Sequence, residues 1–487
     1  MKRVFQSVTG MLLVLLLLLP GVARRSASAD GESRDVSAKC TYESSRKSKY
    51  LRDRLANLDE KEAHALDAGD WVLIRWSDAP VDFVYFCFSD TVGIEPPPYR
   101  IALLDQNGGV IGEREGERYW SSGVAIEEGV YGVRLTVSGK IKLRTLMAFS
   151  GGAPSEYHPW QPTPDKLDFL LIAMHPDDDT LFLGNLMPTY GAERGLTGSI
   201  LYLATRTPVR RIEALNGAWI MGLRTYPLMA GLPDIPIKYR EERKREFLVE
   251  DVERTLVRYL RRLRPEVVFT HDDNGEYGHW QHIVTAAAAR LAVVDAADPS
   301  YDPESANAYG VWQVKKLYLH LAAENPIFIS ATVPLDAFGG RTGWEIAQEA
   351  YQCHQSQRLW NHLCDNENEN SLERFGLVFS AVGPDSGIND AFEHVTTGPA
   401  PTETPTPEPT EAPTEAPTPE PTEVSTEPPT AAPTQTPAPE PVAAPTAGSE
   451  KTEETKRSPV LLFATACMLL AAAGGACAAL LIRRRRG

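Results

Sequence analysis

The stretch DFLLIAMHPDDDT, residues 168–180, decides how the larger part of this chain folds. Its first half belongs to a continuous apolar run from Leu167 to Met174, which is typical of a parallel strand buried on both faces. Imidazole and carboxylate side chains follow this run at once, from His175 to Asp179. Active sites of open α/β sheets lie at the carboxyl ends of the strands, so the sequence predicts a functional site in this loop.

The segments that follow alternate between strand and helix patterns. Apolar runs at Ser199–Ala204 and Glu266–Thr270 predict two more buried strands, while Glu242–Leu263 and Ile283–Val294 have helical patterns. This alternation predicts an α/β domain with a Rossmann-like, mostly parallel sheet over residues 165–394.

Residues 36–150 show short alternating strands separated by Gly, Pro, Asn and Asp, which predicts an antiparallel β-sandwich domain before the α/β domain. The predicted strands are Trp71–Trp76, Val81–Phe88, Tyr99–Leu104, Gly109–Gly112, Tyr131–Val137 and Ile141–Phe149. The order of the segments at Leu51, Trp71 and Tyr99 resembles discoidin or galactose-binding-like modules. Both a sugar-binding role and a structural or docking role remain open for this domain.

The two ends of the chain have the composition of targeting segments. Residues 1–29 combine a basic start, a short apolar run and small residues before a cleavage site, which predicts a signal peptide; an uncleaved anchor is the alternative. The uncharged apolar run at residues 460–482 predicts one transmembrane helix, since about 20 such residues span a bilayer. The basic tail at residues 483–487 predicts a cytoplasmic C-terminus, with the body of the protein outside the cell.

Between body and membrane helix, residues 398–456 predict a disordered stalk rich in Pro, Thr and Glu. Of the 38 prolines in the chain, 15 lie between Pro401 and Glu450, beside 12 threonines, nine glutamates and no basic residue. Such a segment cannot bury a core and is expected to be extended. The whole chain carries a net charge of −16, which argues against nucleic acid as a partner because phosphate binding needs basic patches.

The cysteines leave two arrangements open. Those outside the apolar C-terminal run could pair as Cys40 with Cys87 and Cys353 with Cys364, or they could be buried free thiols.

A second polar cluster, HDDNGEYGHWQH at residues 271–282, also follows a predicted strand. His279 and His282 are three residues apart, so they share one face if the following segment is helical. Helix capping explains one or two of the acids after His175, but not His-Pro followed by three aspartates. Two imidazoles and one carboxylate with open positions are typical of a catalytic zinc site.

Both clusters carry a family resemblance. His175-Pro-Asp-Asp and Gly278-His279-x-x-His282 resemble the paired signatures of the LmbE-like (PIG-L) family of zinc-dependent N-deacetylases, which act mainly on N-acetylglucosamine-containing compounds. The resemblance extends along most of residues 165–357, where the matching segments are Arg210-x-x-Glu213-Ala214, Gly222, Leu232-Pro233-Asp234, Arg264–Val268 and His354-x-Ser356-Gln357.

The resemblance implies a role for each polar residue of the two motifs. His175, Asp178 and His282 match the zinc ligands. Asp177 matches the general base, and His279 matches the group that steadies the tetrahedral intermediate. These roles agree with the chemistry, because amide hydrolysis needs a polarised carbonyl, an activated water and a proton carrier.

Further acidic and basic residues belong to the predicted site. Asp179 stands where the family usually has Glu, and its shorter side chain predicts that support for the ligands is lost or supplied by water, giving reduced or retuned activity. Arg210 and Asp234 match positions that approach the sugar in the family, with surface salt bridges as the alternative. Asp272 or Asp273 could support the ligands or stabilise its own turn.

The remaining candidates divide into packing and cleft residues. Trp280 lies between the motif histidines and is predicted either at a substrate cleft or in helix packing, and His354 is predicted to be structural. The remaining histidines, predicted to be ordinary residues, are His64, His158, His320, His362 and His394.

The leading hypothesis is an exported, membrane-tethered, zinc-dependent hydrolase that removes acetyl groups from an N-acetylated amino sugar, in a GlcNAc-containing glycan or conjugate. Its predicted location is the cell membrane, crossed once by the C-terminal helix. The alternative is a surface carbohydrate-binding or adhesion protein with an inactive deacetylase-like scaffold. A zinc hydrolase of another amide is a third hypothesis, and the sequence leaves the oligomeric state open.

Overall fold

The structure, a computed structural model, describes residues 33–57, 63–89, 94–205, 207–358 and 368–398. The predicted signal peptide, the transmembrane helix and its basic tail lie outside these residues, as does all but the first residue of the predicted stalk. Among the described residues, no helix has the length and apolar character needed to cross a membrane.

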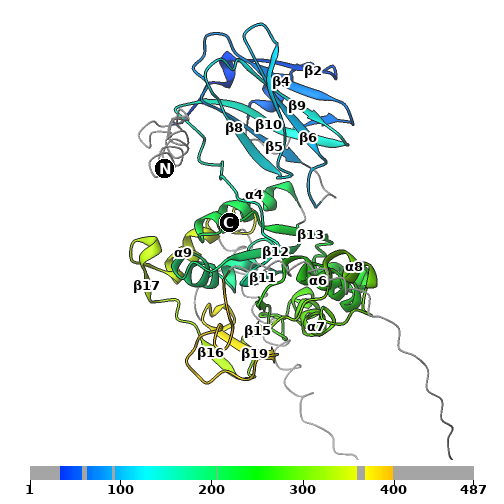
Figure 1. Cartoon of the computed structure of the whole chain (residues 1–487), viewed down its shortest axis with the longest axis vertical. Coiled ribbons are helices and arrows are strands. Elements are labelled where there is room, and N and C mark those ends of the chain that lie inside the picture. Colours follow the sequence, from blue (N-terminus) through cyan, green and yellow to red (C-terminus); the bar gives the residue numbers. More distant parts are fainter. Residues whose placement is uncertain (1–32, 58–62, 90–93, 206, 359–367, 399–487) are drawn as a thin grey trace, which may run out of the picture. The chain divides into compact units, whose positions relative to one another are not determined.

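The N-terminal domain consists of two five-stranded antiparallel sheets, drawn in blue to cyan in Figure 1. One sheet has the order β1-β10-β5-β8 with β3 paired to β10, and the other has the order β2-β4-β9-β6-β7. Its elements are β1 (Arg34–Asp35), η1 (Ser37–Lys39), β2 (Thr41–Ser44), α2 (Leu51–Leu55), β3 (His64–Leu66), β4 (Trp71–Arg75), β5 (Phe83–Ser89), β6 (Tyr99–Leu104), β7 (Val110–Glu115), β8 (Ser121–Ala125), β9 (Gly132–Val137) and β10 (Ile141–Ser150). The antiparallel N-terminal domain is therefore confirmed.

The two sheets share one apolar core. Ile74 and Val133 from one sheet and Phe86 and Leu146 from the other are fully buried in the same cluster. The sequence did not predict β8, because its small residues lack the β-branched signal of a strand. A small residue is needed at Gly123, because a Cβ atom there would lie 2.3 Å from the Phe83 ring.

The described cysteines form no disulfide. Cys40 and Cys87 are buried and are not joined to each other, so of the two arrangements left open the buried thiols are confirmed for this pair. Cys353 is likewise a thiol, and Cys364 lies outside the described residues. Burial fits this result, because a free cysteine packs as a small apolar residue.

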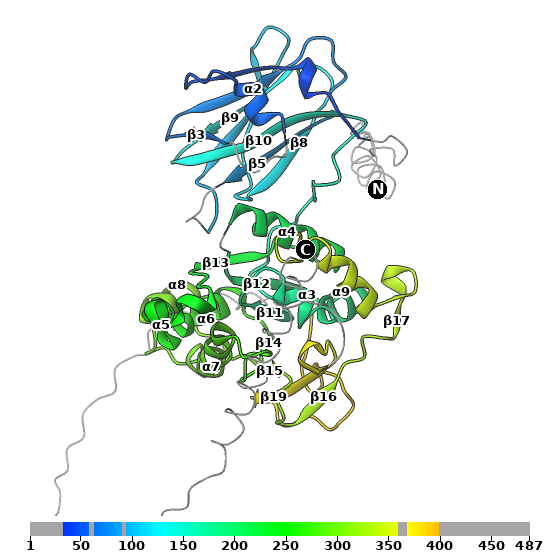
Figure 2. The same ribbon diagram turned by 180° about the vertical axis from the view of Figure 1, so that it is seen from behind.

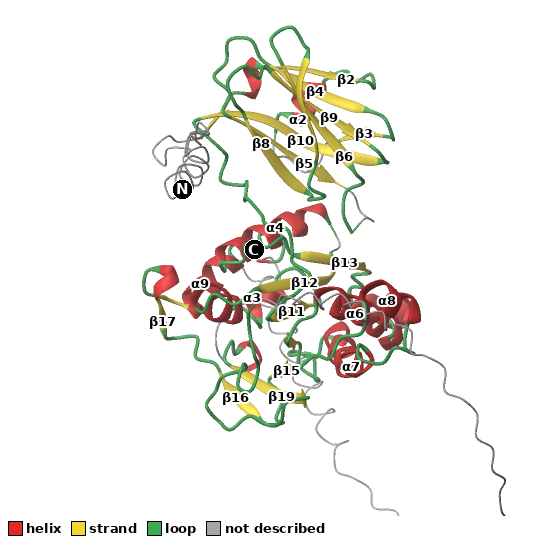
Figure 3. Cartoon of the chain, viewed as in Figure 1, coloured by secondary structure: helices red, strands yellow, loops and turns green. Residues whose placement is uncertain are grey.

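The second domain alternates helices and strands around a seven-stranded sheet of order β13-β12-β11-β14-β15-β19-β16 (Figure 3). Its strands are β11 (Phe169–Ala173), β12 (Gly198–Ala204), β13 (Leu228–Leu232), β14 (Val267–Thr270), β15 (Lys316–His320), β16 (Pro326–Phe328), β17 (Pro334–Leu335), β18 (Arg341–Thr342) and β19 (Arg374–Ser380). Its helical segments are α3 (Asp178–Leu181), η2 (Met187–Glu193), α4 (Pro208–Ile220), η3 (Ile237–Tyr239), α5 (Arg240–Arg243), η4 (Lys244–Glu246), α6 (Val249–Leu263), α7 (Trp280–Asp295), α8 (Pro303–Tyr309), η5 (Asp336–Phe338), α9 (Gly343–Tyr351) and η7 (Asn368–Asn370). The α/β class is confirmed.

The sheet is mostly parallel, and its strand order creates a switch point. The strands β13, β12, β11, β14 and β15 run parallel, while β19 and β16 are antiparallel additions at one edge. The chain moves outward from β11 through β12 to β13, and then returns to β14 on the other side of β11. Ligand sites of doubly wound sheets lie at the carboxyl ends of strands at such a point.

Helices cover both faces of this sheet, as the view from behind in Figure 2 shows for α9 and α6. Alternate β11 residues explain the two layers: Phe169 and Leu171 pack in one cluster with α4 and α9, whereas Leu170 and Ile172 pack in another with α6 and α7. The continuous apolar run of β11 is therefore buried on both sides.

One predicted helix is wrong in its bounds. The helix expected over Glu242–Leu263 is interrupted, because α5 and η4 end before Phe247 and α6 begins at Val249. Phe247 is 2% exposed and packs edge-on against Trp280, with ring centroids 5.8 Å apart. The charged residues of this segment favour a helix, but the helix is interrupted at Phe247, where the ring is buried in the core.

Candidate metal centre

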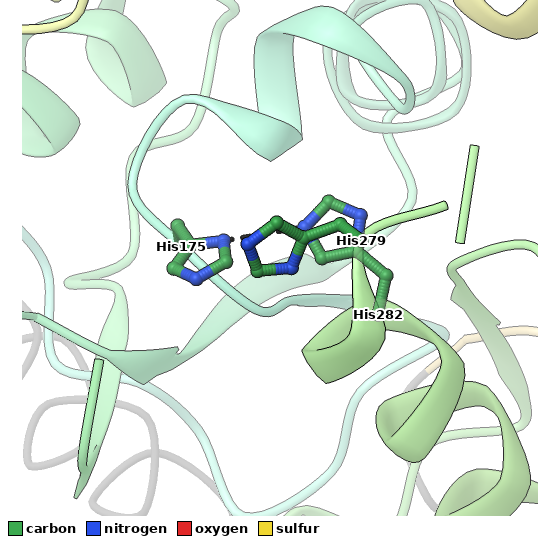
Figure 4. A group of neighbouring side chains, drawn as sticks. All are labelled: His175, His279 and His282. Carbon is green, nitrogen blue, oxygen red and sulfur yellow. Dashed lines mark hydrogen bonds between the residues drawn. The ribbon is translucent and has the colours of Figure 1, made fainter. Parts of the chain in front are cut away.

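Two loops meet at the switch point of the sheet. Residues 175–179 follow β11, and residues 271–282 follow its parallel neighbour β14. Because both strands end at the same edge, the two polar clusters of the sequence lie together. His279 precedes α7 and His282 lies in its first turn, so both imidazoles approach His175 from the opposite side, as Figure 4 shows.

Three donor atoms form a compact triangle at this edge. His175 Nδ1 lies 3.1 Å from Asp178 Oδ2, and His282 Nε2 lies 3.2 Å from each of them. Ligand atoms bound at 2.0–2.1 Å to a tetrahedral zinc ion are about 3.3 Å apart. The donor set of two imidazoles and one carboxylate therefore fits a zinc-sized cation and could hold one.

The triangle is buried and strongly charged. Burial opposes ionisation of Asp178, but the His282 and His175 imidazoles hold its pKa well below the usual range. Burial also opposes protonation of His282, yet the Asp178 and Glu276 carboxylates raise its pKa to about 10. A cation bound here would replace the proton on His282, since metal ligands must be deprotonated.

His279 offers a ring nitrogen within 4.8 Å of the His175 and His282 donors, and His271 offers one within 4.8 Å of the Asp178 and His282 donors. His271 is already occupied: its Nε2 accepts the Met174 backbone N–H at 2.9 Å, and its Nδ1 faces Glu276 at 3.2 Å. His279 is different, because its buried Nδ1 has no hydrogen-bond partner among the described residues. Burial and the neighbouring imidazoles lower the pKa of His279 to about 2, which leaves its ring neutral.

Asp177 is held beside the triangle in an unusual backbone conformation. Its φ angle is 121°, and its Oδ1 accepts a hydrogen bond from Arg210 Nη2 at 2.6 Å. Burial raises the pKa of Asp177 well above its usual range, although the guanidinium opposes this effect. Arg210 also donates through Nη1 to Asp234 Oδ2 at 3.1 Å, so one guanidinium links the two carboxylates.

Asp179 turns away from the donor triangle. Its Oδ2 accepts the Tyr202 hydroxyl at 2.7 Å, and its Oδ1 accepts the Asp177 backbone N–H at 3.2 Å. Burial raises the pKa of Asp179 to about 7. The shorter acid is therefore supported by the Tyr202 hydroxyl rather than left without a partner, and it steadies the backbone of Asp177.

A cleft of about 500 Å³ opens over these groups. Its lining residues are His175, Asp177, Asp178, Leu181, Thr207, Arg210, Asp234, Pro236, Ile237, Tyr277, His279, Ser356 and Gln357. Arg210 is 8% exposed, and Asp234 is half-buried. Neither residue therefore lies on an open surface. Tyr277 is 47% exposed at the cleft and was not identified from the sequence.

The structure also settles the packing of two ambiguous residues. Trp280, the first residue of α7, is 4% exposed and lies in the core, so of its two predicted roles helix packing is the one observed. Asp273 pairs with Arg290 on the surface, at 2.5 Å, and so does not support the donors.

Glu276 and His320 form part of the site that the sequence reading missed. The side chains of both are fully buried, with Glu276 Oε1 3.2 Å from His320 Nδ1. His320 ends β15, the parallel neighbour of β14, so the strand-end rule identifies it only once this strand and its pairing are known. Glu276 lies in the loop after β14, between Gly275 and Gly278, and nothing in this local sequence predicts that its side chain reaches the site.

The fold and the site define a class: an α/β domain whose candidate metal centre lies at the switch point of a parallel sheet, beside a buried carboxylate. The PIG-L family, described as GlcNAc-PI de-N-acetylase, matches residues 170–293. These residues form a PIG-L/LmbE-like domain, as the sequence motifs predicted.

Several curated relatives of this domain are described as deacetylases. A 1D-myo-inositol 2-acetamido-2-deoxy-alpha-D-glucopyranoside deacetylase of Geodermatophilus obscurus is 32% identical over 177 residues, which are 31% of this chain and 59% of the relative. A protein with the same description, numbered 1, from Frankia casuarinae is 28% identical over 294 residues, covering 47% of this chain and 95% of its own length. The chain thus spans 59% of the length of the Geodermatophilus relative.

Among solved structures, the N,N'-diacetylchitobiose deacetylase of Pyrococcus horikoshii is 19% identical, with a TM-score of 0.30. The match covers 40% of this chain and 73% of that one.

Proposed function

We propose that this protein is a zinc-dependent N-deacetylase that hydrolyses the acetamide of an N-acetylated amino sugar, in a GlcNAc-containing glycan or conjugate. The observation that carries the proposal is the triangle of His175 Nδ1, Asp178 Oδ2 and His282 Nε2, with sides of 3.1–3.2 Å, beside the Asp177 carboxylate. The deacetylase relatives of the PIG-L/LmbE-like domain support the choice of an acetylated amino sugar.

In this proposal, His175, Asp178 and His282 hold the zinc ion, which when bound polarises the acetamide carbonyl and makes water a better nucleophile. Asp177 takes the proton of the attacking water and returns it to the departing amine. Arg210 keeps that carboxylate aimed into the cleft through the 2.6 Å hydrogen bond. Preorganisation of this kind lowers the barrier because no reorientation is needed during the reaction.

The other cleft residues bind the substrate and its developing charge. His279 is neutral, and its ring donates an N–H to the oxygen that becomes negative in the tetrahedral intermediate. Asp234 lines the cleft and accepts hydroxyl groups of the sugar. Arg210 contributes to sugar binding chiefly by fixing Asp234, since two of its nitrogens are already committed to carboxylates.

We extend the proposal to an exported protein held at the cell membrane by one helix at residues 460–482, with its body outside and its C-terminus in the cytoplasm. The uncharged apolar composition of that segment and the arginines after it support this location. Membrane fractionation of the full chain should place it in the membrane pellet, whereas deletion of residues 460–487 should release it. Retention of the shortened chain in the pellet would contradict the single-helix tether.

The enzymatic proposal is tested by metal content and product formation together. The full chain in detergent should contain about one zinc per chain by elemental mass spectrometry and should release primary amine from N-acetylated amino sugars. His282→Ala should lose both, while the remote control His394→Ala should keep both, because His394 is exposed. Absence of zinc from the wild-type protein after reloading at neutral pH would overturn the proposal.

The same measurements separate the alternatives. A carbohydrate-binding protein with an inactive scaffold would bind sugar without releasing amine; its support in the sequence was Asp179, which the structure pairs with Tyr202. A zinc hydrolase of another amide would bind zinc but leave every N-acetylated sugar of a panel intact while cleaving other acylated amines.

A further inference from the structure

The side chain of Glu276 lies behind the donor triangle and is fully buried. Its Oε2 lies 2.7 Å from His282 Nδ1, the ring nitrogen that faces away from the triangle. Its Oε1 lies 3.2 Å from the Nδ1 atoms of both His271 and His320 and accepts the Asp272 backbone N–H at 3.0 Å. One carboxylate therefore gathers three imidazoles from the ends of β14, β15 and α7.

The backbone at Glu276 adopts a conformation that favours glycine. Its φ angle is 53°, between Gly275 at 70° and Gly278 at 86°. A residue with a Cβ atom is strained in this region relative to the right-handed region. The contacts of the carboxylate must offset this strain, since a glycine would adopt the same turn without it.

Hydrogen-bond donors around Glu276 can be assigned from their other partners. His271 Nε2 accepts the Met174 N–H, so its proton is on Nδ1 and points at Glu276. His320 Nε2 donates to the Ser371 carbonyl at 2.7 Å, while its Nδ1 also faces the carboxylate. Both rings therefore lie against the same carboxylate oxygen, each with its other nitrogen hydrogen-bonded to the backbone.

We infer that Glu276 is a positioning residue that fixes His282 with its Nδ1 toward the carboxylate and its Nε2 directed at the metal, and that His271 and His320 hold Glu276 in place. The inference rests on the proposed function, because it gives Glu276 a purpose only if His282 binds a metal ion. Carboxylate partners of metal-bound histidines set the ring orientation and strengthen the ligand.

This arrangement also separates the roles of the neighbouring histidines. The second nitrogen of His271 is occupied by the Met174 N–H, so His271 braces Glu276 and does not complete a second metal site with Asp178 and His282. His320 contacts the same Glu276 oxygen as His271, so both rings restrict the position of the carboxylate that faces His282.

The experiment measures zinc affinity of the full chain in detergent by competition with a chromophoric chelator. Glu276→Gln keeps the volume and loses the charge, and it should weaken zinc binding by about 10–100-fold. His320→Gln should weaken it in the same direction, by about tenfold, and the double variant should be no weaker than Glu276→Gln. The matched control is Glu373→Gln, because Glu373 is also buried but accepts the Ala331 backbone N–H at 2.7 Å.

A structural role alone would give a different result. It would lower the melting temperature of metal-free Glu276→Gln but leave zinc affinity within twofold of the wild type, and this outcome overturns the inference while sparing the proposed function. A wild-type protein that binds no zinc overturns both. If Glu276→Gln does not fold, Glu276→Gly removes the carboxylate and the strain together; its zinc affinity should then fall by the same factor, and an unchanged affinity overturns the inference.

Discussion

The loops after β11 and β14 use the same backbone device for different purposes. Each holds an acid at positive φ, 121° at Asp177 and 53° at Glu276, and each acid is fixed by cationic or N–H partners. Asp177 lines the cleft, whereas the side chain of Glu276 is fully buried behind His282. In the proposed mechanism, the carboxylate that lines the cleft carries the proton and the one that is fully buried orients a metal ligand.

The largest effect is expected from a change at Asp177, the carboxylate that lines the cleft. Asp177→Asn keeps the shape and a hydrogen-bond acceptor for Arg210 but cannot take a proton from water. Amide hydrolysis should fall by about 10²–10⁴-fold, measured by amine release, while zinc content stays at the wild-type level. Loss of zinc from this variant would show that Asp177 belongs with the ligands rather than with the proton carriers.

The next effect comes from removing the partner of Asp177. Arg210→Met frees both Asp177 and Asp234 from their shared guanidinium, and misplacement of the base should lower kcat by about 100-fold. The guanidinium also opposes the raised pKa of Asp177, so its loss raises that pKa further and moves the acid limb of the kcat/KM profile to higher pH.

The control for this variant is Arg194→Met, because Arg194 forms an ion pair on the surface with Asp390 at 2.7 Å. The control should keep the wild-type profile. An acid limb that stays in place in Arg210→Met would contradict the assignment of Asp177 as the base.

Much of the fold could be predicted because local sequence and burial agree. The apolar run of β11 is buried on both faces, and the polar residues after β11 and β14 meet because neighbouring parallel strands end at one edge. The two polar clusters could therefore be brought together from the strand pattern, while the choice of His175, Asp178 and His282 as ligands came from the family resemblance.

The supporting residues could not be found in the same way. Glu276 depends on a positive φ angle that no local pattern requires, and His320 depends on the pairing of β15 with β14, some 50 residues apart in sequence. Tyr202, which meets Asp179, lies in the middle of a buried strand, where a tyrosine is indistinguishable from an ordinary core residue. Side-chain partners of this kind follow from tertiary structure.

A smaller effect is expected at the loop after β11, where Asp179 accepts the hydroxyl of Tyr202. Tyr202→Phe removes the hydroxyl that satisfies Asp179 Oδ2, and the carboxylate is completely buried. A buried acceptor left without its donor should lower the free energy of unfolding by about 1–3 kcal/mol, measured by urea denaturation of the metal-free protein. The exposed Tyr309→Phe should change it by less than about 0.5 kcal/mol. Equal stability of the two variants would mean that Asp179 finds another donor.

The smallest effect concerns a buried imidazole that lacks the carboxylate found at Glu276. Neither ring nitrogen of His354 has a hydrogen-bond partner among the described residues, and burial lowers its pKa to about 3 from an ordinary value near 6.5. Below pH 6.5 the unfolded chain therefore binds a proton that the folded chain does not, so stability falls with pH until about pH 3. His354→Phe removes this pH dependence. Between pH 7 and pH 5.5, the free energy of unfolding of the variant should therefore fall by about 1 kcal/mol less than that of the wild type. The exposed His394→Phe should follow the wild-type curve, and a parallel curve for His354→Phe would show that His354 takes up a proton in the folded state.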